Sequence, residues 1–142
     1  MKPIVELLDK RDPALFKVAP HVMVFDGLQL LADHGVGAML VMDGEKLVGV
    51  FSERDYTRKV ALQGKNSRQT PISEIMTANV ISVVPKTSTH ECMALMSQHK
   101  IRHLPLVDNG KVVGMISIRD IMDYIIADHE QTIAQLQTYI SS

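Results

Sequence analysis

The chain has 142 residues, of which 46% are hydrophobic and 22% charged, and these values are typical of a soluble globular protein with one shared core. A formal net charge of −1, 4% aromatic residues and no tryptophan argue against a basic nucleic-acid-binding surface or a base-stacking platform. No apolar run approaches the roughly 18 residues of a membrane span and no secretory signal starts the chain, so we expect a cytoplasmic protein without membrane contact.

The first predicted element is a short helix at residues 4–10, IVELLDK, inside an N-terminal lead-in that spans residues 1–17. Beyond it the chain contains an internal repeat, because a shift of 65 residues aligns residues 18–56 with residues 83–121 without a gap. Identical residue types recur, 65 positions apart, at Pro20, His34, Asp43, Lys46, Val48, Gly49, Ser52, Arg54 and Asp55. We therefore assign repeat 1 to residues 18–62 and repeat 2 to residues 72–127.

Each repeat predicts the same order of elements. A short strand, NVISVVP in repeat 2, precedes a helix of about three turns, which Ser88 and Glu91 begin as a Ser-x-x-Glu capping box. Two apolar runs joined by DGEK or DNGK then predict a hairpin, and a second helix begins at Ser52 or Ser117. The predicted fold class is α/β (α+β), with two β-α-β-β-α repeats packed sheet to sheet as a pseudo-twofold pair, because one copy is too small to bury its own sheet.

The repeats are joined by a predicted linker at residues 63–71, a polar stretch that favours a loop. At its end Thr70 is expected to cap a short helix that Pro71 opens. A C-terminal amphipathic helix is predicted at residues 128–142 and has one apolar face, formed by Ile133, Leu136 and Ile140. Such a face predicts burial against the body of the protein or against a second subunit.

The duplicated signature Gly-apolar-apolar-Ser-x-x-Asp resembles the CBS domain, a family named for cystathionine β-synthase and usually found in tandem pairs. The segments VGAMLVMDGEKLVGVFSERDY and IRHLPLVDNGKVVGMISIRDI carry this resemblance, and ISEIMTANVISVVP is similar to the family's entry segment. The resemblance implies two clefts between the repeats that bind adenine nucleotides or related adenosyl ligands. It also implies a stand-alone pair of the kind that often forms a homodimer.

The tetrads SERD, from Ser52 to Asp55, and SIRD, from Ser117 to Asp120, have two interpretations. Residue chemistry alone favours helix caps, because the serine accepts hydrogen bonds from the first turn and the aspartate suits the helix dipole. A carboxylate can also accept from the two vicinal hydroxyls of a ribose. The resemblance favours the ligand role, since in CBS sites the matching aspartate contacts the ribose and a Ser or Thr lies beside it.

Arg102 and His103 stand where repeat 1 has Gly37 and Ala38. A guanidinium fork suits a phosphate and an imidazole can donate from either nitrogen, although a strand entrance with solvent-facing charges is the alternative. The resemblance implies that a basic residue at this turn faces the phosphate. Because the repeats differ at these two positions, we expect one cleft with basic residues for a ligand phosphate and one cleft without them.

Five further residues are candidate ligand contacts. Arg54 and Arg119 either steer a phosphate or point outward from the second helical position. Base recognition in the family uses backbone groups and apolar walls, for which we take Val80, Ile81 and Pro105.

A metal site and a reactive thiol are the less favoured interpretations of two further features. His99 and His103 are four residues apart, but the second falls beyond the predicted helix, so a shared metal is not expected. Cys92, the single cysteine, excludes an internal disulfide and aligns with Gly27, which favours a small buried side chain. No nucleophile elbow or phosphate-binding glycine loop marks a catalytic site, and no resident cofactor is expected.

The preferred function is a regulatory sensor that binds an adenosine-containing ligand, such as AMP, ADP, ATP, NAD(H) or S-adenosylmethionine, in its clefts without catalysis. An interaction module with vestigial clefts, whose terminal helices bind an unidentified target protein, is the first alternative. A small nucleotide-processing enzyme with Asp55 or Asp120 as general base is the second. The expected partners are the small molecule and a second copy of the chain, with no nucleic acid and no membrane.

Overall fold

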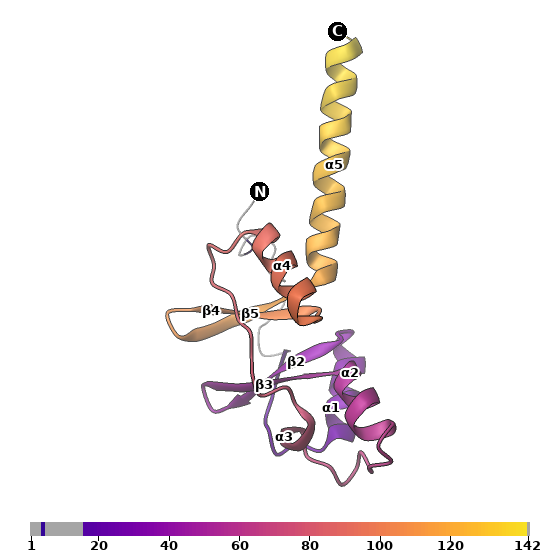
Figure 1. Ribbon diagram of the computed structural model, residues 1–142, viewed down its shortest axis with the longest axis vertical. Helices are drawn as coiled ribbons and strands as arrows, with labels where there is room; N and C mark the ends of the chain where they lie inside the picture. Colours follow the sequence, from indigo (N-terminus) through magenta and orange to yellow (C-terminus); the bar gives the residue numbers. More distant parts are fainter. Residues whose placement is uncertain (1–3, 5–15, 142) are drawn as a thin grey trace.

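The computed structural model describes residue 4 and residues 16–141 (Figure 1). The helix predicted at residues 4–10 therefore lies outside the described residues, except for Ile4, which is buried in the core of repeat 2. The side chains of Ile133, Leu136 and Ile140 also lie outside the described part, so their predicted stripe stays a prediction.

Each repeat is built on a hairpin. In repeat 1, β2 (Ala38–Asp43) pairs antiparallel with β3 (Lys46–Ser52) and parallel with β1 (Lys17–Val18). In repeat 2, β4 (His103–Asp108) and β5 (Lys111–Ser117) form the same hairpin 65 residues further along. The register shifts at equivalent positions of β2 and β4, so the duplication extends to the irregularity of the ladder.

The turn residues explain why both hairpins form. Asn109 and Gly110 both have positive φ angles, 52° and 79°, as a type I′ turn requires. In repeat 1 only Gly44 is positive, at 61°, as in a type II′ turn. Both turns match the twist of the flanking strands, and the two predicted hairpins are confirmed.

Helices follow the strands in the predicted order. They are α1 (Val24–His34), α2 (Glu53–Tyr56), its π-helical continuation η3 (Thr57–Ala61), α3 (Ile72–Ile75), α4 (Thr89–His99) and α5 (Ile118–Ser141). The Ser88 hydroxyl accepts a hydrogen bond from the Glu91 N–H at 3.1 Å at the start of α4, which confirms the serine half of the predicted capping box. Both α1 and α4 have 11 residues, the three turns predicted.

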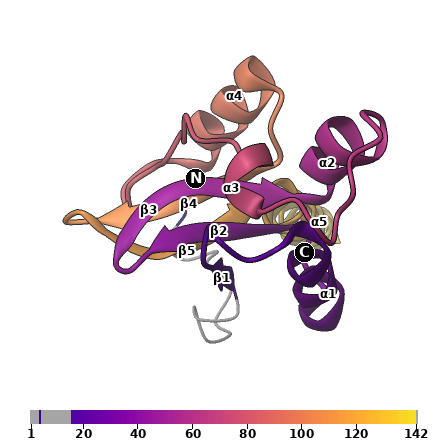
Figure 2. The ribbon, with the colours of Figure 1, turned by 90° about the horizontal axis from the view of Figure 1, so that it is seen from below.

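The two sheets lie face to face, with α1, α2 and α3 on the outer side of one and α4 on the outer side of the other (Figures 1 and 2). The alternation of side chains along β2 produces this layering. Met39 and Val41 pack with the helices of repeat 1, whereas Leu40 and Met42 face the other sheet and Met115. The predicted fold class and sheet-to-sheet packing are confirmed.

The segment predicted as a strand at the start of repeat 2 is not a regular strand. Only Val83 bridges β4, with its N–H donating to the Pro105 carbonyl and its own carbonyl accepting from the Val107 N–H. The next residue that would donate to β4 is Pro85, which has no N–H, and the Val84 N–H donates to the Thr87 hydroxyl at 3.1 Å. Pairing with β4 therefore ends after one residue.

The predicted Thr70 cap is also wrong. The Thr70 hydroxyl donates to the Asn66 carbonyl at 2.8 Å, within the preceding loop, and no side chain caps the start of α3. Pro71 occupies the N-cap position and the helix begins at Ile72.

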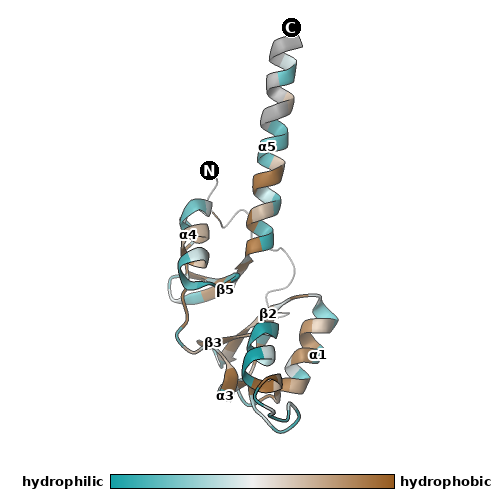
Figure 3. Cartoon of the chain, turned by 45° about the vertical axis from the view of Figure 1, so that its right-hand side comes forward, coloured by the Kyte–Doolittle hydropathy of each residue, from teal (hydrophilic) through white to brown (hydrophobic). Residues whose placement is uncertain are grey.

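α5 runs without interruption from Ile118 to Ser141, so the predicted division at residues 127 and 128 falls inside one helix. The sequence offers neither proline nor glycine in this range to break it. The helix leaves the body and extends away from it (Figure 1), and much of its described outer part is hydrophilic (Figure 3). No helix in the described part of the chain is long and apolar enough to cross a membrane.

Candidate functional site

Both tetrads begin helices as their residue types predict. The Ser52 hydroxyl accepts from the Asp55 N–H at 3.2 Å, and Asp55 Oδ2 accepts from the Ser52 N–H at 2.9 Å. In repeat 2 the Ser117 hydroxyl accepts from the Asp120 N–H at 3.1 Å, and Asp120 Oδ2 accepts from the Ser117 N–H at 2.8 Å. Each tetrad is therefore a reciprocal capping box, and the cap interpretation is confirmed for both.

A cavity of about 260 Å³ lies beside Asp55, between the two repeats. Repeat 1 contributes the end of β3 and the start of α2, and repeat 2 contributes its lead-in segment and β4. Its walls include eight of the predicted ligand residues: Ser52, Arg54, Asp55, Val80, Ile81, Arg102, His103 and Pro105. We call this cavity the Asp55 cleft.

A second cavity of about 400 Å³ lies beside Asp120, and we call it the Asp120 cleft. It is lined by the end of β5, the start of α5 and the segment that leads into β2. Five predicted ligand residues lie in its walls: Arg102, His103, Ser117, Arg119 and Asp120. Phe16 and Met115 supply apolar surface there, and Met115 is the counterpart of Val50 in the Asp55 cleft.

Arg102 and His103 line both clefts, because β4 begins where the two repeats meet. The predicted difference between the two clefts therefore does not come from Arg102 and His103. The two clefts also share Gly37, where an added Cβ would lie 3.6 Å from His103 Cε1. The clefts differ instead in the bonding of their aspartates.

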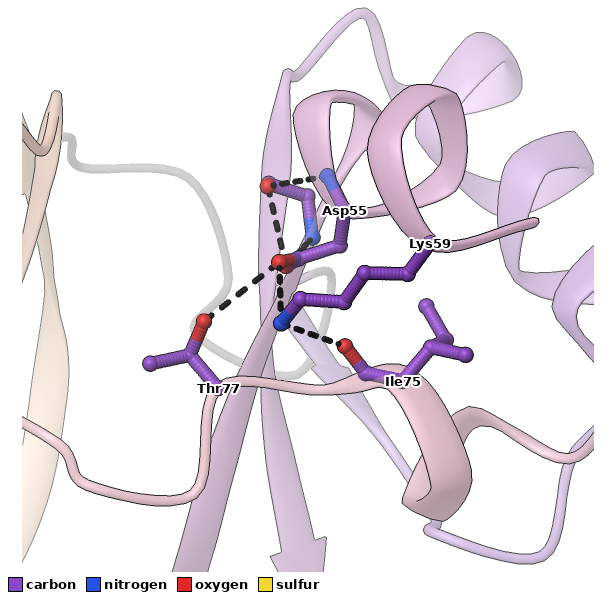
Figure 4. Close-up of polar contacts among 5 residues, drawn as sticks. Asp55, Lys59, Ile75 and Thr77 are labelled. Atoms are coloured by element: carbon purple, nitrogen blue, oxygen red, sulfur yellow. Dashed lines mark hydrogen bonds and ion pairs between the residues drawn. The ribbon is translucent and has the colours of Figure 1, made fainter. Parts of the chain in front are cut away.

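The carboxylate of Asp55 is held by four donor contacts (Figure 4). Oδ2 accepts from the N–H and, at 3.0 Å, from the hydroxyl of Ser52. Oδ1 accepts from the Thr77 hydroxyl at 3.4 Å and pairs with the Lys59 ammonium at 3.1 Å. Because a carboxylate offers about four acceptor positions, these contacts occupy the acceptor capacity of Asp55. The residue is only 7% exposed.

Asp120 has the same cap but fewer contacts. Within the described residues, the Ser117 N–H is the one donor to its carboxylate, and that bond uses Oδ2. The position equivalent to Lys59 is Tyr124. Asp120 is half-buried rather than buried, so its second oxygen keeps acceptor capacity beside the cavity.

Arg54 crosses the Asp55 cleft instead of pointing outward. Its guanidinium donates to the Lys100 carbonyl at 3.0 Å, which ties the start of α2 to the end of α4 in the other repeat. Lys100 is the C-cap of α4, with a left-handed φ of 55°. Arg119, the counterpart of Arg54, is exposed and lines the Asp120 cleft.

His103 lies where the two clefts meet, and its surroundings shift its pKa. Burial lowers the pKa of His103 from its usual 6.5, the Asp120 carboxylate opposes this effect, and the Arg102 guanidinium adds to it. The neutral imidazole is therefore favoured in the folded chain. The charges of Asp120 and Arg102 both change the pKa of this ring, so an anionic ligand bound in the Asp120 cleft would change it as well.

Two wall residues of the clefts, Phe16 and Thr77, and Lys59, which contacts Asp55 beside its cleft, were not among the predicted residues. Phe16 lies 65 residues before Ile81, so the repeat could have identified it as the matching wall residue. Lys59 follows Asp55 by four residues, the spacing of a helical ion pair, and that signal was available in the sequence. Thr77 had no such signal, because only the chain path after α3 brings it to Asp55.

The two features set aside in the sequence have structural roles. His99 ends α4 and His103 begins β4, so the pair does not share a helix turn. Cys92 is fully buried in the core of repeat 2, and burial, together with the nearby Glu91, raises the pKa of its thiol to about 11. It is a core residue, as predicted, since a nucleophilic thiol needs a lowered pKa.

The chain matches the CBS domain family over residues 8–62 and 72–127. It is 34% identical over 122 residues to the CBS domain-containing protein CBSX3, mitochondrial, of Arabidopsis thaliana, with 82% of this chain and 59% of that protein covered. The chain therefore spans about three fifths of that relative's length.

Two solved structures extend the likeness to the fold. A protein with CBS domains from Burkholderia ambifaria MC40-6 is 44% identical, with a TM-score of 0.84, and the match covers 89% of this chain and 96% of that one. A CBS domain protein from Pyrobaculum aerophilum complexed with AMP is 31% identical, with a TM-score of 0.73 and coverage of 83% and 88%. Since the matched segments contain the two structural repeats and the folds agree, the chain belongs to the CBS domain family and carries two CBS domains.

Proposed function

We propose that this chain is a regulatory module that binds an adenosine-containing ligand in the Asp120 cleft and catalyses no reaction. The observation that carries the proposal is the remaining acceptor capacity of Asp120 at the wall of a cavity of about 400 Å³. Vicinal ribose hydroxyls are donors that a carboxylate oxygen can accept in pairs. The AMP complex of the relative from Pyrobaculum aerophilum supports the choice of ligand class.

The other walls of the Asp120 cleft suit the remaining parts of such a ligand. Arg102 and Arg119 place guanidinium groups at the cavity, and a guanidinium fork matches the oxygens of a phosphate. Phe16 and Met115 offer apolar surface for a base. The ribose acceptor, phosphate donors and apolar wall thus occur in one cavity, which supports a nucleotide over an isolated anion or an apolar molecule.

Regulation follows from where the cleft lies. The cavity is formed by both repeats, and Arg102 and His103 belong to the walls of both clefts, so an occupied cleft changes the contacts between the repeats. Such a change regulates a partner only if the ligand has different affinities for two arrangements of the chain. We propose a second copy of the chain, or a target protein, as the element that responds.

Asp120→Asn tests the ligand role, because asparagine keeps an acceptor for the cap but removes the charge and one carboxylate oxygen. Calorimetric titration with AMP, adenosine and S-adenosylmethionine should show binding to the unmodified chain and a loss of about 10- to 100-fold in the variant, the size of a lost hydrogen bond to a charged group. A circular-dichroism melt of both proteins controls for folding. Unchanged affinity in a folded variant would contradict the proposal.

Two further outcomes separate the alternatives. Steady formation of a product from any of these compounds would replace the regulatory module with a small enzyme. Binding of none of them would favour an interaction module with vestigial clefts, for which the extended α5 is the supporting feature.

A further inference from the structure

We infer that Lys59 occupies the Asp55 oxygen that a ribose would need, so that one chain binds a nucleoside at the Asp120 cleft alone. This inference rests on the proposed function and assigns Lys59 the role of setting how many ligands a chain binds. It starts from the contacts in Figure 4, where Lys59 reaches the carboxylate that would otherwise receive the ribose.

The acceptor positions of Asp55 are already used within the protein. Ser52 supplies two donors, Thr77 one and Lys59 one, which matches the roughly four lone-pair positions of a carboxylate. A ribose that bound here would have to displace Thr77 or Lys59 from Oδ1. The displaced ammonium would lose a charged partner that is 90% buried or more, which makes the exchange unfavourable.

A second acceptor keeps the Lys59 ammonium in place. Its Nζ donates to the Ile75 carbonyl at 3.0 Å while it pairs with Asp55, so the ammonium lies between α2 and the end of α3. The side chain of Lys59 is 41% exposed, and its position depends on these two contacts rather than on burial. Removal of the ammonium therefore frees the Asp55 oxygen without opening the core.

The backbone around Lys59 has no counterpart in repeat 2. In repeat 1 the helix after the tetrad changes from α2 to the π-helix η3 at Thr57, and Lys59 lies on η3. In repeat 2 the helix after the tetrad continues as the α-helix α5, and the equivalent residue is Tyr124. Tyr124 has no ammonium group, so among the described residues the ion pair of Lys59 with Asp55 has no equivalent at Asp120.

The test counts binding sites with AMP and with adenosine as probes. Titration calorimetry and equilibrium dialysis should give one site per chain in the unmodified protein, with any second event at least about tenfold weaker, the effect of losing a hydrogen bond to a charged group. Lys59→Met keeps the aliphatic stem and removes the ammonium, so it should bind two molecules per chain. Lys65→Met, on the exposed loop after η3, is the matched control and should still bind one.

A double variant identifies which cleft gains the ligand. Lys59→Met combined with Asp120→Asn should bind one molecule, at the Asp55 cleft, whereas Asp120→Asn alone should bind none strongly. If Lys59→Met lowers the melting temperature too far to titrate, Lys59→Leu, which also has no donor, replaces it.

Two equal sites in the unmodified chain, or one site in folded Lys59→Met, would overturn the inference and leave the proposed function intact. No binding of either probe to the unmodified chain or to Lys59→Met would instead remove the proposed function. The two failures are therefore distinguishable in one series of titrations.

Discussion

Equivalent residues of the two repeats have different surroundings, and the aspartates show this best. Asp55 and Asp120 have the same sequence neighbours in the tetrad and the same cap geometry. Asp55 has further contacts with Lys59 and Thr77, which lie outside the tetrad. Asp120 instead lies in the wall of a cavity that His103 also lines. The local motif sets the cap, and more distant residues set the acceptor capacity.

His103 makes the stability of the folded chain depend on pH. Burial lowers its pKa below 6.5, with Asp120 opposing and Arg102 adding to the shift, so the unfolded chain binds the proton more tightly than the folded chain. The His103 contribution to stability is therefore complete above the unfolded pKa, and it is lost as the pH falls through 6.5 towards the folded pKa.

Urea unfolding of the unmodified chain and of His103→Gln, at about pH 8 and about pH 5.5, measures this effect. The difference in unfolding free energy between the two pH values should be larger for the unmodified chain. Parallel behaviour of the two proteins would show that His103 does not contribute.

Equivalent elements of the repeats keep their bounds but differ in how they end. α1 and α4 both have 11 residues and both end in a left-handed C-cap, which is Gly35 with φ 65° in repeat 1 and Lys100 with φ 55° in repeat 2. A left-handed conformation carries a steric cost for any residue with a Cβ. Lys100 tolerates it in the position where its carbonyl accepts from Arg54.

Gly35→Ala tests the cost of the cap directly, because nothing lies within 4 Å of an added Cβ and only backbone conformation changes. We expect a loss of about 1 kcal/mol in unfolding free energy, measured by chemical denaturation. Lys100→Gly is the reciprocal control and should be neutral or slightly stabilising. A neutral Gly35→Ala would mean that the end of α1 rearranges.

At the scale of the whole molecule, the two repeats share the core between their sheets. Phe16, Ala38, Leu40, Met42 and Met115 form this cluster, and each repeat also has a core of its own under its helices. The shared core brings the tetrad of each repeat against β2 or β4 of the other, and the clefts exist only because of that packing.

Leu40→Ala tests the shared core. Leu40 is fully buried between the sheets, and its truncation should cost about 2–5 kcal/mol and lower the stability of both repeats in one cooperative transition. Leu62→Ala is the matched control, since Leu62 is 77% exposed and its loss should change stability by less than about 0.5 kcal/mol. Separate transitions for the two repeats in the Leu40→Ala variant would contradict a single shared core.

The regular part of the fold was predictable from the sequence, whereas some irregular positions were not. The repeat, the hairpins and the helix starts depend on turn glycines, capping serines and apolar alternation, all local signals. The early end of the strand follows Pro85, a residue that the sequence shows. The Thr70 hydroxyl instead donates to the Asn66 carbonyl, and this local bond does not follow from residue type alone.

Residue types and their spacing are enough to predict a duplicated α/β unit with two equivalent tetrads, because duplication and helix capping are local signals. The sequence also predicted two unequal sites, but the contacts that distinguish them are visible only in the folded chain. Arg102 and His103, which the alignment of the repeats assigns to one site, lie where both clefts meet. The i,i+4 spacing of Asp55 and Lys59 was visible in the sequence, but Thr77 reaches Asp55 only through the path of the chain after α3, and an alignment of the repeats cannot place a contact that has no equivalent in the other copy.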